Sequence, residues 1–174
     1  HIRGQIDFAT ILYQKGLYKQ SLKILDKAKS FALKYDENAS AYEIVEFEKL
    51  IESLYVTRSL SNRTNELVSQ TNHLREQNEV YSNLSNISLQ LYEKLIKAGY
   101  AKSDTESKEI KKFFKQKIKS FKIGELGFRE TLIYYQIWVW YSLLIQDFLS
   151  SYKYASKWID TFNTVSYTHL TLPT

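Results

Sequence analysis

The stretch that decides the fold runs from residue 16 to residue 28 and reads Gly16-Leu17-Tyr18-Lys19-Gln20-Ser21-Leu22-Lys23-Ile24-Leu25-Asp26-Lys27-Ala28. Glycine readily adopts the left-handed conformation that ends many helices, so Gly16 predicts the end of a preceding helix. Beyond it, Leu22, Leu25 and Ala28 follow at spacings of three, which places them on one face of a second helix. The stretch therefore predicts two helices joined by a tight turn. Such a unit cannot bury its apolar faces alone and stacks against further helices.

The same residues resemble a tetratricopeptide repeat, the helical-hairpin module of many protein-binding arrays. An aromatic residue follows the turn glycine, and small residues come after it, as Tyr18, Ser21 and Ala28 do here. The resemblance implies a right-handed α-solenoid of antiparallel helical hairpins with a groove that binds peptides or partner proteins.

A looser second match lies near the end of the chain, over Ser150–Phe162. Tyr152, Ala155 and Ile159 repeat the spacing of the first match 134 residues further on. That offset is close to four of the family's repeats of about 34 residues. In this match Ser150 takes the place of the turn glycine and Phe162 the place of the alanine.

The composition predicts long helices and few loops. The 174 residues are 44% hydrophobic and 25% charged, which is typical of a globular domain, and they include five glycines and one proline. We therefore expect an all-α fold of about seven helices, forming a single helical repeat domain over residues 1–164. Apolar periodicity places these helices over residues 2–15, 18–34, 40–55, 62–98, 103–122, 129–149 and 152–162.

Two capping boxes support these boundaries. Ser40 with Glu43, and Ser103 with Glu106, have the spacing at which the side chains of a serine and a glutamate satisfy each other's free amides at a helix start. Because asparagine and serine are poor interior helix formers, a break near residues 82–86 is an alternative to one continuous helix over 62–98.

The two ends of the chain look unusual. The sequence has no methionine and begins inside an expected helix, so we expect it to be a fragment of a longer protein. Residues 165–174 contain no acidic, lysine or arginine residue and hold the only proline. They resemble translated sequencing-adapter read-through, and we expect a non-native tail there. A native extended tail is the alternative.

The sequence contains no recognisable catalytic set. Without cysteine, the chain cannot form disulfides, thiolate nucleophiles or cysteine-bound metal sites, and a reducing, cytoplasmic location fits. His73 is the only histidine away from the two ends, and we expect a solvated helix residue. Glu48 and Glu52, one turn apart, would share a proton if buried, but a hydrated face is the simpler expectation. We predict no enzyme activity, no cofactor and no metal site.

Positive charge is concentrated in one short segment. Residues 108–122 hold seven lysines and Glu109, a net charge of +6, whereas the whole chain carries +5. Five of these lysines share one helical face: Lys108, Lys112, Lys115, Lys119 and Lys122. A basic amphipathic helix contacts an acidic partner, an anionic membrane or phosphates. A solvated face on a packed helix is the alternative, and the segment has no arginine, asparagine or glutamine positioned for reading base sequence.

The aromatic run over residues 132–141 predicts a central helix. The uncharged stretch from 131 to 146 is too short to span a membrane, so we expect no transmembrane segment. A helix buried on most sides, with the polar tips of its tryptophans and tyrosines hydrogen bonded, fits better.

The leading functional expectation is a non-catalytic scaffold or adaptor that binds a peptide or protein partner. In the family that the chain resembles, the first helix of each hairpin lines the groove, which implies contacts from Arg3, Asp7, Thr10 and Gln14. One alternative is the sensory region of a signalling protein, in which the 62–98 helix transmits state to an output domain. Another is non-specific binding of nucleic acid or anionic membrane by the lysine segment.

Overall fold

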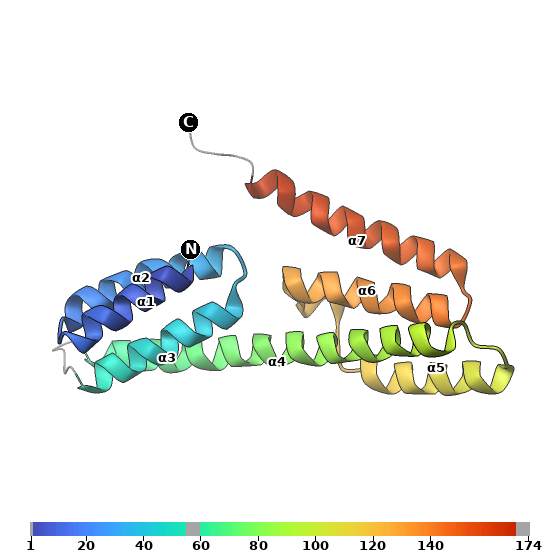
Figure 1. Ribbon diagram of the computed structural model, residues 1–174, viewed down its shortest axis with the longest axis horizontal. Coiled ribbons are helices and arrows are strands. Elements are labelled where there is room, and N and C mark those ends of the chain that lie inside the picture. Colours follow the sequence, from blue (N-terminus) through green and yellow to red (C-terminus); the bar gives the residue numbers. More distant parts are fainter. Residues whose placement is uncertain (1, 55–59, 170–174) are drawn as a thin grey trace. The chain divides into compact units, whose positions relative to one another are not determined.

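The computed structural model describes the backbone of residues 2–54 and 60–169 and the side chains of residues 2–54 and 62–164. Within these residues the chain forms seven α-helices, one 3-10 turn and no strand, so the prediction of an all-α fold is confirmed (Figure 1). The elements are α1 (Ile2–Gln14), α2 (Tyr18–Lys34), α3 (Asn38–Leu54), α4 (Leu60–Ala98), α5 (Asp104–Ile118), η1 (Ile123–Glu125), α6 (Phe128–Leu144) and α7 (Phe148–His169). Helices that follow one another along the chain mostly pack together. The right-handed solenoid stays a prediction.

The chain divides into two compact units, His1–Glu79 and Val80–Thr174. The first contains α1, α2, α3 and the N-terminal part of α4, and the second contains the rest of α4 with α5, α6 and α7 (Figure 1). Helix α4 runs unbroken over 39 residues, so the alternative break near residues 82–86 is absent from it. The expectation of a single domain over 1–164 stays a prediction.

Small side chains hold the first hairpin together. Ala9 on α1 and Ala28 on α2 are fully buried, which lets the two helix backbones approach closely. Ser21, also fully buried, donates a hydrogen bond from its hydroxyl to the Ala9 carbonyl at 2.8 Å. Of the small residues that carry the family resemblance, Ser21 therefore lies at the contact between the two helices, and Ala28 lies in the core of the first unit.

Helix α6 is the centre of the second unit. Its Ile137 and Leu144 are buried with Phe114 of α5 and Leu84 and Leu91 of α4. Residues on nearly every side of α6 are buried or half-buried, as expected for a central helix. The expectation that its polar tips find partners is wrong at one position, because the buried indole Nε1 of Trp138 has no acceptor among the described residues.

Single left-handed residues make the tight turns. Gly16 has φ +74°, and its own amide and that of Leu17 donate to carbonyls of α1. The Leu17 amide donates to the Leu12 carbonyl and the Gly16 amide to the Tyr13 carbonyl, both at 2.9 Å. This is the Schellman arrangement, and it satisfies carbonyls that would otherwise lack partners at the helix end.

The same arrangement recurs at Asp36, with φ 54°, and at Gln146, with φ 60°. The Glu37 amide donates to the Ala32 carbonyl, and the Asp147 amide to the Ser142 carbonyl, each at 2.8 Å. The turn before α7 therefore lies at Gln146, and the placement of Ser150 opposite Gly16 in the second sequence match is wrong by four residues.

Helix starts were predicted correctly at α5 but not at α3. The Ser103 hydroxyl accepts a hydrogen bond from the Glu106 amide at 3.2 Å, which confirms the serine half of that capping box, whereas the Glu106 carboxylate accepts from the Lys102 amide at 2.7 Å. Helix α3 instead begins at Asn38, because the turn at Asp36 leads directly into it, so Ser40 lies inside the helix. Residue 55, at the expected end of this helix, lies outside the described residues.

Replacing Gly16 with alanine should lower the free energy of unfolding by about 1 kcal/mol, because an L-residue is strained at this positive φ. An added Cβ at Gly16 would meet nothing within 4 Å, so the cost is conformational rather than steric. Urea unfolding followed by circular dichroism measures it.

The matched control is Gly4→Ala, inside α1, where an added Cβ also meets nothing within 4 Å. There alanine is the better helix former and should raise the free energy of unfolding by about 0.5–1 kcal/mol. Effects of the same sign at both sites would contradict the assigned role of Gly16.

Candidate functional site

The lysine face of α5, defined as Lys108, Lys112, Lys115, Lys119 and Lys122, is the first candidate site. Helix α5 buries Phe114 and half-buries Ile110, Phe113 and Ile118 against the second core. Because these apolar side chains occupy the inner side of the helix, the lysines point to solvent, and all five are exposed. The predicted separation of a basic side from an apolar side is present.

The helix is shorter than expected, and this changes the last lysine. It ends at Ile118, and Lys119 is its C-cap with helical backbone angles. Lys122 has extended angles and follows the helix rather than lying on it. Its Nζ lies 3.3 Å from the Glu125 carboxylate, and both of these side chains are largely exposed.

The other four lysines have no ion pair among the described residues. No carboxylate in that part of the chain lies within ion-pair distance of Lys108, Lys112, Lys115 or Lys119. Like charges this close repel one another, and the repulsion is relieved when anionic groups approach. The lysine face is therefore suited to bind negative charge.

A polar cavity of about 370 Å³ lies between α4 and α5. The lining on the α5 side comes from Gln116, Lys117 and Ser120. These residues are neighbours in sequence of Lys115 and Lys119 of the lysine face. Its α4 side carries the side-chain amides of Asn83, Asn86 and Gln90. Each amide offers both a donor and an acceptor, which is the pairing that a peptide group requires. The cavity is not evident from the sequence, because its amides come from two helices.

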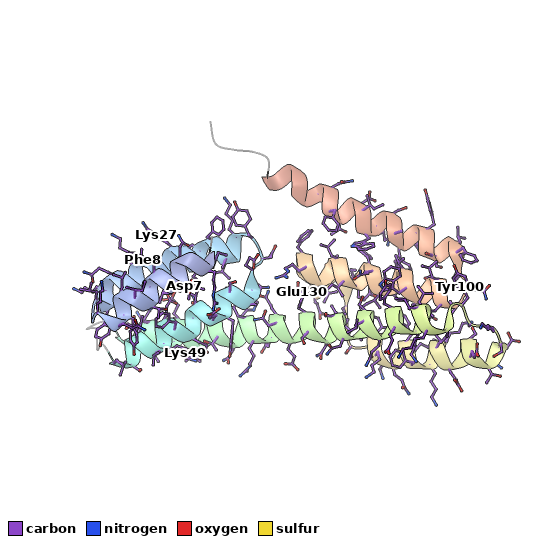
Figure 2. The ribbon with its side chains drawn as sticks, viewed as in Figure 1. Asp7, Phe8, Lys27, Lys49, Tyr100 and Glu130 are labelled. Carbon is purple, nitrogen blue, oxygen red and sulfur yellow. The ribbon has the colours of Figure 1, made fainter. Side chains whose placement is uncertain are left out.

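The four groove residues implied by the family resemblance lie on α1. Arg3, Asp7 and Gln14 are exposed, and Thr10 is half-buried. The Arg3 guanidinium lies 2.7 Å from the Glu43 carboxylate of α3 and 3.9 Å from that of Asp7 (Figure 2 labels Asp7). Thr10 donates its hydroxyl to the Ile6 carbonyl of its own helix at 2.9 Å. The structure brings Arg3 and Asp7 together; it gives Thr10 and Gln14 no shared partner.

The sequence did not reveal a buried cluster of charges in the first unit. Glu48 on α3 is fully buried, and its Oε2 accepts a hydrogen bond from Lys29 Nζ of α2 at 2.6 Å. Arg63 Nη2 of α4 lies 3.2 Å from the other carboxylate oxygen of Glu48, and Arg63 Nε lies 3.7 Å from Glu52. Arg63 thus contacts the carboxylates of both Glu48 and Glu52, the pair considered above for proton sharing. The sequence held one indication of this cluster, because Lys29 follows Leu25 by four residues and so lies on the apolar side of α2.

Burial raises the pKa of the Glu48 carboxyl, because the loss of hydration outweighs the attraction of Lys29 and Arg63. An ionised Glu48 is therefore costly to bury, and Lys29 and Arg63 offset part of that cost. The cluster joins side chains from α2, α3 and α4, so it fixes how these three helices pack. We assign it a structural role.

No group of three or more histidine, aspartate or glutamate side chains in the part of the chain that the structure describes could hold a metal ion. No helix among the described residues is long and apolar enough to cross a membrane. His73 is exposed on α4, as expected.

Lys29→Met and Glu48→Leu should each lower the free energy of unfolding by about 3–5 kcal/mol, because each removes one partner of a buried ion pair. The double variant should recover most of that loss, since two apolar side chains replace the pair. Urea unfolding of all four proteins measures the coupling.

Lys49→Met is the control, because Lys49 forms only a half-buried pair with Glu46 at 2.7 Å (Lys49 is labelled in Figure 2). It should change the free energy of unfolding by less than about 1 kcal/mol. If the free energy of unfolding of the double variant were as low as that of the less stable single variant, the Lys29–Glu48 pair would not be the source of the loss.

Comparison of this chain with protein-family models, with curated proteins and with solved structures finds no match. The chain is an all-helical protein in which seven helices pack within the described residues, and its resemblance to tetratricopeptide repeats stays a prediction.

Proposed function

We propose that this chain is a non-catalytic protein-interaction module that binds an acidic segment of a partner protein through the lysine face of α5. The observation that carries the proposal is the set of four exposed lysines, Lys108, Lys112, Lys115 and Lys119, without an ion pair among the described residues. Carboxylates of a partner would supply the missing counter-charge and relieve the repulsion between the lysines.

The polar cavity favours a peptide over phosphate groups. Lysines alone attract a membrane, a nucleic acid or a protein equally well, because all three offer negative charge. The amides of Asn83, Asn86, Gln90 and Gln116 add donors and acceptors beside the lysines. Phosphates offer acceptors only, whereas a peptide backbone offers both, so an acidic peptide uses more of this surface.

The proposal includes the tetratricopeptide-like arrangement of hairpins. The support is that the hairpins α1–α2 and α6–α7 turn through the same hydrogen bonds after one left-handed residue. In such an array Arg3, Asp7, Thr10 and Gln14 would form a further partner contact, which stays a prediction.

The test is binding of a fluorescein-labelled acidic peptide, rich in glutamate and glycine, measured by anisotropy at low and high salt. Replacing Lys112, Lys115 and Lys119 with glutamate should weaken binding about tenfold or more at low salt, because attraction becomes repulsion. The matched control reverses Lys19, Lys23 and Lys27, which are exposed on α2, and gives the same net charge. That control should change the affinity less than about twofold, because these three lysines do not belong to the lysine face that the proposal assigns to the peptide.

Equal losses in the two triple variants would overturn the proposal, because net charge alone would then explain the binding. A DNA oligonucleotide or a phosphatidylserine vesicle is titrated in parallel. If either binds more tightly than the peptide and loses binding in the α5 variant alone, the ligand is that polyanion and the acidic-protein proposal is wrong.

A further inference from the structure

Helix α7 carries an apolar stripe that the rest of the described chain leaves open. Phe148, Tyr152, Ile159 and Phe162 are 56%, 75%, 59% and 53% exposed, and half-buried Ala155 lies between them. These residues recur at spacings of three, four and seven, so they share one side of the helix. Soluble proteins rarely leave such a continuous stripe uncovered.

The charges of α7 are kept away from this stripe. Over residues 148–164 the helix has three charged residues, Lys153, Lys157 and Asp160. At 3.6 residues per turn they fall together on a different side of the helix. The charged residues of a helix normally lie on its hydrated face. A helix face without charged residues is therefore typical of a face that packs against another element.

Helix α2 shows what covers the corresponding face. Counted from the left-handed residues Gly16 and Gln146, Ser151 takes the position of Ser21, and both serines are buried. In the same register Ala155 takes the position of Leu25, Ile159 that of Lys29 and Phe162 that of Ala32.

In α2 these positions are buried, with Leu25 and Ala32 fully so. Helix α3 packs on α2, and its Glu48 reaches Lys29 at 2.6 Å. The same positions of α7 are open, and the lysine that requires a carboxylate is replaced by isoleucine.

We infer that the stripe of α7 is a docking surface for an amphipathic helix of a partner protein, held as α3 is held on α2. The chemistry of the partner follows from the exchange of Lys29 for Ile159. A carboxylate at the position of Glu48 would be buried against Ile159 without a cation, which is costly. The partner helix therefore presents an apolar side chain there. This surface is apolar and lies on α7, so it differs from the basic lysine face of α5.

The test uses α3 itself as the probe. A labelled peptide of residues 38–54 is kept helical by Ala39→Lys, whose amine forms a lactam with Glu43, because both positions are exposed. It is made once with Glu48 retained and once with Glu48→Leu, and each version is titrated against the full chain by anisotropy. The Glu48→Leu peptide should bind about tenfold or more tightly than the peptide that retains Glu48, because only the latter buries an unpaired charge.

Ile159→Lys in the chain should reverse that preference, since it recreates the pair between Lys29 and Glu48 on α7. The control, Asp160→Lys, adds a lysine one residue away on the charged side and should leave the preference unchanged. The chain variants are checked by circular dichroism, so that loss of folding is not mistaken for loss of binding.

Three results would overturn the inference: equal affinity of the two peptides for the chain, no reversal by Ile159→Lys, or no binding of either peptide up to about 1 mM. Sedimentation of the chain alone tests whether a second copy of this chain occupies the stripe. A dimer that Ile159→Lys converts to monomer would show that a second copy, and not a partner helix, covers the stripe.

Discussion

The arrangement of the helices depends on one backbone constraint: a single left-handed residue that closes a helix and reverses the chain. At Gly16, Asp36 and Gln146 the amide of the next residue donates to a carbonyl five residues earlier. The next helix starts within two residues, so neighbouring helices run antiparallel and in contact. Two of these residues are not glycine, at a cost of about 1 kcal/mol each, which the packing of the hairpins has to offset.

Within this frame, the side chains between the helices decide what each hairpin can accept. On α2 a buried lysine demands a carboxylate, and α3 supplies it through Glu48. On α7, Ile159 takes the position of Lys29 and packs best against an apolar side chain. Two hairpins with the same turn therefore differ in the helix that they can bind, because a buried charge without a partner is far more costly than a buried methyl group.

The helix pattern of the sequence predicted most of the fold. The limits of α2 and the cap at Ser103 follow from local signals that tertiary contacts did not override. The turn at Gln146 was missed because glutamine is no signal for a left-handed residue; Asp147, which accepts hydrogen bonds from Ser150, was the better marker of the start of α7. The Lys29–Glu48 contact and the amide cavity between α4 and α5 join separate helices, and no local pattern encodes such pairings.

The distribution of tryptophan makes the two units optically distinct. All three indoles, Trp138, Trp140 and Trp158, belong to the unit Val80–Thr174, and the unit His1–Glu79 has none. Trp138 stacks on Tyr154 at 4.8 Å between ring centres, and its indole nitrogen is buried without an acceptor among the described residues. Emission excited selectively at tryptophan therefore reports the second unit alone, whereas far-ultraviolet ellipticity reports both. A denaturation curve recorded by the two signals separates the melting of one unit from that of the other without any added label.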